Sequence, residues 1–139
     1  MRVLLDTCVL SEIRRPEART SVTDAVARLP DEDTYLSAVT LGELASGVAR
    51  LVEGRRRRAL AAWLDGLEST YAERILPVDA EVARLWGELD ANARRMGRSV
   101  GVADGLIAAT ARRHGLHVMT RNVDDFSPTG TLVVNPWED

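Results

Sequence analysis

The chain contains no lysine and only one cysteine, Cys8, among its 139 residues. A single cysteine excludes an intrachain disulfide, which is typical of proteins from a reducing cytosol. No apolar run approaches the length of a membrane span, and the first residues lack the basic and then apolar layout of a secretory signal. We therefore expect a cytoplasmic protein that does not enter a membrane.

Because lysine is missing, arginine supplies the positive charge, and it is concentrated in three blocks. These blocks are Arg55 to Arg58, then Arg94, Arg95 and Arg98, then Arg112 and Arg113. The formal net charge of −3 argues against a dedicated nucleic-acid-binding domain, which is usually strongly basic. The planar guanidinium group nevertheless donates paired hydrogen bonds to phosphate. The blocks are therefore either phosphate-binding surfaces or solvated helix faces, and both interpretations stay open.

The composition and length predict a single domain over residues 1–139. Hydrophobic residues make up 45% of the chain and charged residues 28%, as in an ordinary globular protein. The chain is long enough for one core and too short for two. It contains no repeat, no low-complexity segment and no Pro/Gly/Ser-rich linker. Its glycines form no phosphate-loop pattern, so nucleotide-cofactor binding has no support.

Short apolar segments alternate with segments of helical periodicity. Strands are predicted at residues 2–6, 34–37, 75–78, 118–119 and 132–134. Helices are predicted at residues 7–14, 21–29, 40–53 and 55–72, then after a cap at Asp79, and at 101–114. This alternation predicts a parallel sheet with helices on both faces. In such sheets, sites form beyond the carboxyl ends of the strands.

Acidic side chains recur beside these apolar segments. Asp6 closes the first predicted strand, Glu43 follows the second, and Asp104 interrupts an apolar helix. A carboxylate among apolar neighbours without a cationic partner loses solvation energy, so several of them together suggest a divalent metal. Structural alternatives exist for two of them: Asp6 is a typical N-cap, and Thr40 with Glu43 forms a capping box.

Asp104 is the most informative of these acids. No arginine lies three or four residues from it on its predicted helix, although a first-turn position does suit a negative charge. We therefore favour a functional role for it. Asp124 and Asp125 follow a strand in a predicted loop, where solvated aspartates are common. Arg121, closer to the strand end, is a candidate to position a phosphate.

The remaining polar candidates have simpler structural interpretations. His114 precedes the helix-ending Gly115 and is interpreted as a capping residue, and Cys8 as a small core residue. A metal-independent nuclease using His114 and His117 as acid and base is a further hypothesis. Only two residues separate these histidines, which disfavours their flanking one phosphate.

Four segments in order resemble the PIN-domain family, with the VapC-type toxins and their FitB branch as the nearest members. The segments are Leu5 to Glu12, Ser37 to Leu44, Ala103 to Ala111 and Thr120 to Phe126, and the ending Asn135-Pro136-Trp137 is similar to that branch too. The resemblance covers essentially the whole chain. It implies a three-layer α/β/α sandwich with a short, mostly parallel central sheet. It also implies an endoribonuclease that depends on Mg²⁺ or Mn²⁺.

The resemblance assigns roles to particular acids. Asp6 and Asp104 would bind the metal, and Glu43 would be a third acidic member of the catalytic site. The fourth acid of the FitB branch falls on Asn122, an uncharged amide. Either Asp124 or Asp125 then substitutes, or the site has three acids; Asp124 is our candidate. Cys8 is a second departure, because relatives often carry asparagine there.

The resemblance also implies partners. The expected assembly is a homodimer that cleaves RNA and is held inactive by a small VapB/FitA-like antitoxin, through which alone it reaches operator DNA. An alternative is that the chain is the non-catalytic half of a DNA-binding repressor complex with that antitoxin. The amide at Asn122 and the acidic net charge keep this alternative open.

Overall fold

The computed structural model describes residues 1–138, and residue 139, the last of the predicted domain, lies outside the described residues. Its centre is a five-stranded sheet in the order β3-β2-β1-β4-β5. Every neighbouring pair of strands is parallel. The strands are β1 (Val3–Leu5), β2 (Thr34–Ser37), β3 (Ile75–Leu76), β4 (His117–Met119) and β5 (Val133–Val134).

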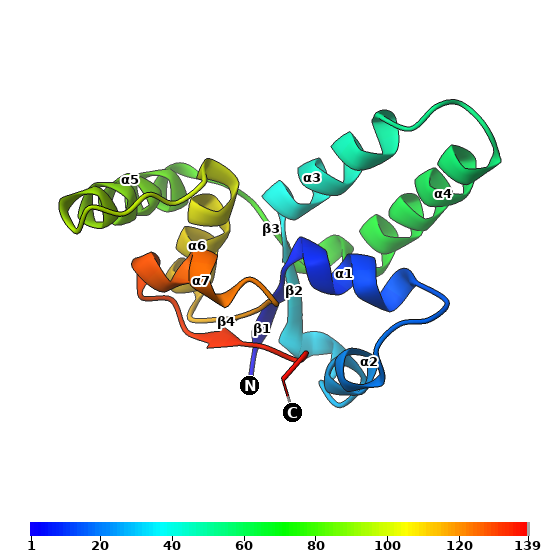
Figure 1. Ribbon diagram of the computed structural model, residues 1–139, viewed down its shortest axis with the longest axis horizontal. Coiled ribbons are helices and arrows are strands. Elements are labelled where there is room, and N and C mark those ends of the chain that lie inside the picture. Colours follow the sequence, from blue (N-terminus) through cyan, green and yellow to red (C-terminus); the bar gives the residue numbers. More distant parts are fainter. Residues whose placement is uncertain (139) are drawn as a thin grey trace.

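Helices cover both faces of this sheet, as expected (Figure 1). The first group packs on one face and consists of α1 (Thr7–Arg14), α2 (Thr20–Ala27), α3 (Ala38–Ala49) and α4 (Arg55–Thr70). The second group packs on the other face and consists of α5 (Ala80–Arg95), α6 (Val102–His114) and α7 (Val123–Phe126). The predicted three-layer α/β/α sandwich is thereby confirmed.

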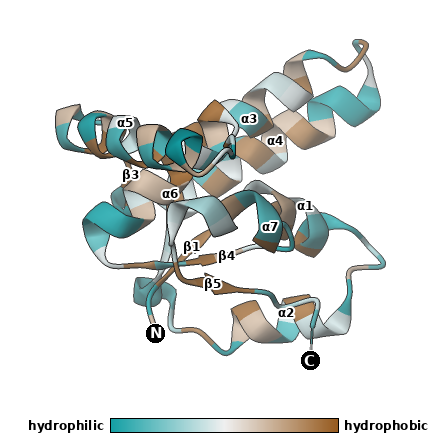
Figure 2. Cartoon of the chain, turned by 60° about the vertical axis from the view of Figure 1, so that its left-hand side comes forward, coloured by the Kyte–Doolittle hydropathy of each residue, from teal (hydrophilic) through white to brown (hydrophobic). Residues whose placement is uncertain are grey.

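The strands are short apolar runs because side chains on both of their sides are buried. In β1, Val3 and Leu5 enter the core beneath α1 and α2, whereas Leu4 enters the core beneath α5 and α6. All three side chains are fully buried. Figure 2 shows the hydrophobic strands between helices whose outer surfaces are largely hydrophilic. Burial on two faces is what a parallel sheet requires of its central strand.

The start of α3 differs from the prediction. Ser37, not Thr40, is the N-cap, and its hydroxyl accepts the Val39 N–H at 3.0 Å. Thr40 is buried inside the first turn, and its Oγ1 atom has no hydrogen-bond partner within residues 1–138. The predicted capping box of Thr40 and Glu43 is therefore wrong. Since Ser37 satisfies the helix start, the Glu43 carboxylate is left available for another partner.

Other boundaries move by a few residues. The helix α3 ends at Ala49 instead of residue 53, and β3 ends at Leu76, which leaves Val78 39% exposed. The segment with Asp124 and Asp125 is the short helix α7, not a loop. Among the described helices, none is long and apolar enough to cross a membrane.

A glycine allows α5 and α6 to pack closely. A Cβ atom on Gly105 would lie 2.8 Å from both Cδ1 and Nε1 of Trp86. This separation is shorter than real Cβ contacts, so the indole of α5 needs a glycine at this position of α6. Asp104 is the adjacent residue of α6, so this contact determines where its carboxylate lies.

Candidate active site

Asp6 lies at the carboxyl end of β1, where the sheet order switches from β2 on one side to β4 on the other. This is the position where parallel α/β sheets bind ligands. Its Oδ1 atom accepts the Thr7 N–H at 2.8 Å as the N-cap of α1, so the predicted cap is confirmed. Its Oδ2 atom accepts the Thr120 hydroxyl at 2.7 Å. Asp6 is 4% exposed, and its carboxylate is held from both oxygens.

Strand pairing explains why Thr120 meets Asp6. Leu5 pairs with Met119, and the Asp6 N–H donates to the Met119 carbonyl at 3.0 Å, so the next residues lie opposite each other. The Thr120 hydroxyl also accepts the Asn122 N–H at 3.0 Å. Its single proton is therefore directed at Asp6, and its lone pair is used by the backbone of the following turn.

Cys8 belongs to the wall of the same site. Its Sγ atom lies 3.7 Å from Oδ2 of Asp6 and 3.4 Å from the Thr120 hydroxyl, and it accepts the Arg121 N–H at 3.5 Å. Burial raises the pKa of the Cys8 thiol, and the negative charge of Asp6 adds to the increase. The thiol stays protonated, so it acts as a weak hydrogen-bonding group and not as a nucleophile. Its side chain also packs against the core, as predicted.

Glu43 extends from the second turn of α3 towards α1. Its Oε1 atom accepts the Thr7 hydroxyl at 2.7 Å. Thr7 thus donates its backbone N–H to Asp6 and its hydroxyl to Glu43. One residue connects two of the three predicted acids, which lie on different elements of the fold.

Asp104 lies in the first turn of α6 and faces the other acids. Its pKa is raised to about 6, first by burial and then by the negative charges of Asp6, Asp125 and Glu43, in that order. Electrostatic repulsion of this size falls off with distance, so all four carboxylates face a common region. That Asp6, Glu43 and Asp104 share one metal site stays a prediction, supported by these charge effects on Asp104.

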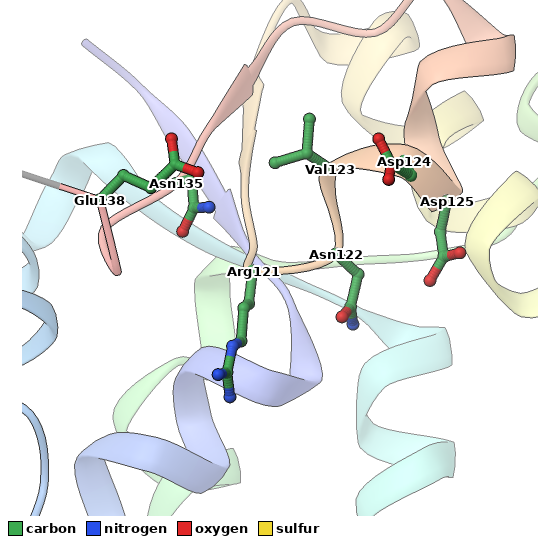
Figure 3. Close-up of a pocket in the computed structure, with 7 residues that line it drawn as sticks. All are labelled: Arg121, Asn122, Val123, Asp124, Asp125, Asn135 and Glu138. Atoms are coloured by element: carbon green, nitrogen blue, oxygen red, sulfur yellow. The ribbon is translucent and has the colours of Figure 1, made fainter.

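The helix α7 separates the two aspartates that sequence reasoning treated together. Asp125 is one of the charges that raise the pKa of Asp104, whereas Asp124 is not among them. Figure 3 shows their carboxylates pointing in different directions, with Asp125 on the same side as Asn122. Successive residues of a helix are rotated by about 100°, so only one of two neighbours faces a given site. A loop prediction could not make this choice.

A pocket of ≈ 500 Å³ adjoins this region on the β5 side. Arg121, Asn122 and Asp124 line it together with Asn135 and Glu138 from the chain end (Figure 3). The guanidinium of Arg121 lies 5.6 Å from the ring centre of Trp137, a cation–π distance. Stacking fixes Arg121 at the edge of the acidic site, where it is available to an anionic group.

The two histidines lie elsewhere. His114 ends α6 and His117 begins β4, so His117 lies at the amino ends of the strands, whereas Asp6 lies at their carboxyl ends. They share no site with the acids. The metal-independent hypothesis therefore gains no geometric support.

The acids present a donor set suited to a hard divalent cation. Carboxylate oxygens are the ligands that Mg²⁺ and Mn²⁺ prefer, and the raised pKa of Asp104 reports negative charge without a balancing cation. Within residues 1–138, no three His, Cys, Asp or Glu side chains form a group that could hold a metal ion. Mg²⁺ is usually held by one or two carboxylates and keeps several waters, so a site of two acids would suffice. The residues fit a cation of this kind.

Comparisons with known proteins agree with this fold. The PIN domain model matches residues 3–130. Toxin FitB of Neisseria gonorrhoeae is 41% identical over 138 residues, which cover 99% of each chain. The VapC ribonuclease Y4jK of Sinorhizobium fredii is 39% identical over 98% of each chain. A solved structure of FitAB bound to an IR36 DNA fragment superposes with a TM-score of 0.93 at 38% identity, covering 99% of this chain and 96% of the other.

Proposed function

The chain belongs to the PIN-domain family, and from this membership we propose that it is a metal-dependent endoribonuclease, the toxin of a type II toxin–antitoxin pair acting in the cytoplasm. The substrate is RNA, whose phosphodiester bonds it hydrolyses. The family and its ribonuclease relatives support the reaction class. The residues and the metal are our assignment.

The observation that supports this proposal is the half-buried carboxyl of Asp104, which is acted on by the charges of three other acids. Asp104 has a pKa raised to about 6 by burial and by Asp6, Asp125 and Glu43. Such an arrangement destabilises the protein unless a cation joins it, so structural stability does not explain it. The negative sites also repel a phosphate, which again requires a cation between them and the RNA.

Asp6 and Asp104 are the proposed metal ligands, and Glu43 acts beside them. A bound Mg²⁺ or Mn²⁺ would lower the pKa of the attacking water and offset the charge that develops on the phosphate. Thr7 and Thr120 keep Asp6 in one orientation, so its free lone pairs point at the site. Glu43, held by the Thr7 hydroxyl, is placed to accept a proton from the water. Arg121 is placed to donate to a phosphate oxygen.

We assign the fourth acidic position to Asp125 instead of Asp124. Support comes from the charge of Asp125 acting on Asp104, and from its direction in Figure 3. The resemblance places the family's acid on Asn122, an amide that also faces this side. A carboxylate three residues further along restores the missing charge because α7 turns it towards the site.

A partner is part of the proposal. The FitAB structure holds its DNA fragment as a complex. By analogy, we propose that this chain forms homodimers with a small VapB/FitA-like antitoxin, which provides the only contact with operator DNA. The second candidate function is that of a non-catalytic half of a DNA-binding repressor complex with the antitoxin, in which the chain does not cleave RNA. The presence of Asp6, Glu43 and Asp104 favours the nuclease.

The test is cleavage of a fluorescent single-stranded RNA by the purified protein with Mg²⁺ or Mn²⁺. We expect cleavage that EDTA abolishes and that Asp104→Asn lowers by at least about a hundredfold. Asp24→Asn, an exposed aspartate of α2, is the matched control and should retain full activity. Cleavage that survives EDTA, or an active Asp104→Asn protein, contradicts the proposal. Calorimetric titration with Mn²⁺ distinguishes the second candidate, in which no metal binds.

A further inference from the structure

A groove of ≈ 250 Å³ lies between α1, α3 and α4. Figure 1 shows α3 and α4 side by side, with α1 next to them. The floor of the groove is apolar, formed by leucine and valine side chains of α3 and α4 together with Trp63. Two arginines, Arg14 of α1 and Arg56 of α4, form its basic rim. We call this feature the α1/α3/α4 groove.

This groove runs directly into the acidic site. Thr7 and Glu43 line it, and these residues also hydrogen-bond to each other beside Asp6. Any chain that lies in the groove therefore passes the carboxylates that we assign to catalysis.

The charges of the rim are not used within the fold. Arg14 and Arg56 are exposed, and neither forms an ion pair with a carboxylate among residues 1–138. Arg14 lies 5.8 Å from the ring centre of Trp63, so its guanidinium is preorganised over an aromatic surface. In contrast, Arg94 and Arg113 of the other two blocks form ion pairs with carboxylates.

The position of the first arginine block supports an anionic ligand. Arg55 to Arg58 occupy the first turn of α4, which contains no acidic residue, and the N-cap Gly54 offers no side chain to the free N–H groups. Positive charge at a helix N-terminus opposes the helix dipole. Arg57 donates to the Leu51 carbonyl at 3.3 Å, but the positive charge of the block as a whole is unfavourable for the N-terminus of α4. Its Arg56 joins the rim of the groove.

We propose that the α1/α3/α4 groove binds single-stranded RNA on one side of the bond to be cleaved. Arg14 and Arg56 contact consecutive phosphates, while the apolar floor and Trp63 receive a base or ribose. Single-strand-binding proteins commonly combine a basic track with aromatic and apolar contacts of this kind. Contacts to phosphate and stacking surfaces position the RNA with little dependence on its sequence. This inference rests on the proposed nuclease function, and it identifies single-stranded RNA as the substrate class.

The test measures binding separately from cleavage. The probe is a fluorescein-labelled single-stranded RNA of about ten nucleotides, and EDTA keeps it intact while anisotropy is recorded over a salt series. Arg14→Gln/Arg56→Gln should weaken binding by about tenfold or more, and should reduce the salt slope by about 1.4, since each single-strand phosphate contact contributes about 0.7. The matched control, Arg95→Gln/Arg98→Gln at the end of α5, changes the net charge equally and should leave the slope unchanged.

Several outcomes overturn the proposal. Equal losses in both double variants would mean that overall charge, not the groove, attracts RNA. Unchanged RNA affinity in the groove variant would also overturn the proposal. If that variant instead loses a copurifying antitoxin, the groove binds a protein partner and not RNA. Because Arg14 packs on Trp63, its replacement could disturb the fold, so the single variant Arg56→Gln is measured as well. Arg56 is exposed, and this variant should show about half of the slope reduction of the double variant.

Kinetics in Mg²⁺ then separate the two proposals. Groove variants should raise KM several-fold while kcat stays within about twofold, because they remove contacts distant from the reacting atoms. If the wild-type protein binds the RNA through the groove but never cleaves it, the nuclease proposal fails and the groove stands. If it cleaves with unchanged KM in the variants, the groove proposal fails and the nuclease stands.

Discussion

The hydroxyl of Thr120 donates to Oδ2 of Asp6 at 2.7 Å, although 114 positions separate the two residues in the chain. This bond connects the end of β4 to the end of β1. It is buried, and its acceptor is a carboxylate oxygen. Its function is to hold one oxygen of Asp6 while the other caps α1.

Replacing Thr120 by valine tests this relationship. The Thr120→Val protein keeps the side-chain shape but leaves Oδ2 of Asp6 with only the weak Cys8 thiol. Outer-shell partners of metal ligands usually contribute 10- to 100-fold, so we expect Mn²⁺ affinity and RNA cleavage to fall by about that factor. Titration calorimetry and cleavage rates provide the measurement. Thr120→Ser, which retains the hydroxyl, should restore most of both; failure of this rescue would show that packing matters more than the bond.

The two aspartates of α7 should differ in their contribution to activity. Asp125 raises the pKa of Asp104, while Asp124 lines the neighbouring pocket. We therefore expect Asp125→Asn to reduce kcat by about tenfold or more and Asp124→Asn to change it by less than about threefold. The two variants remove the same charge from adjacent positions, so each is the control of the other. If Asp124→Asn instead gives the larger loss of kcat, Asp124 and not Asp125 is the fourth acid of the site.

Much of this architecture was predictable because each strand is a separate apolar run. Asp6 at the end of β1 and Asp104 in the first turn of α6 followed from local pattern alone. For Glu43, the spacing from Thr40 also allowed a capping role as an alternative, and this alternative is wrong because Ser37 begins the helix. The position of Thr120 depends on which strands become neighbours. Local periodicity contains no information on that pairing.

Asp104 should make the metal-free protein less stable as pH rises. Its folded pKa is about 6, against 3.8 for the free side chain. Between these values the folded state holds a proton that the unfolded state has released, so stability falls as pH increases through this window and stays low above it. The side chain is half-buried, and with solvent screening we expect a loss of about 1 kcal/mol. Urea unfolding in EDTA across this pH range measures it.

Asp104→Asn is the companion variant for this measurement. An amide has no proton to lose, so the variant should be more stable than the wild type by about 1 kcal/mol at neutral pH and should show a flatter pH dependence. Adding Mn²⁺ should raise the Tm of the wild type and not that of the variant. A variant less stable than the wild type in EDTA would contradict the unbalanced charge that we describe.

Gly105 connects the packing of two helices to the position of an acid. In Gly105→Ala the new methyl group would meet the Trp86 indole at 2.8 Å, so α6 must move away from α5 or the indole must turn. Overpacking of this kind typically costs about 1–3 kcal/mol. Because Asp104 precedes Gly105 on α6, we expect weaker Mn²⁺ binding in addition to a lower Tm.

Gly66→Ala, at a helical position of α4 with open space around it, is the matched control and should be neutral or slightly stabilising. If both variants lose stability equally, the contact with Trp86 is not the specific cause, because Gly→Ala at an open helical position should not destabilise. A Gly105→Ala/Trp86→Leu double variant tests the contact directly, since relieving the clash restores stability only if the contact is the cause.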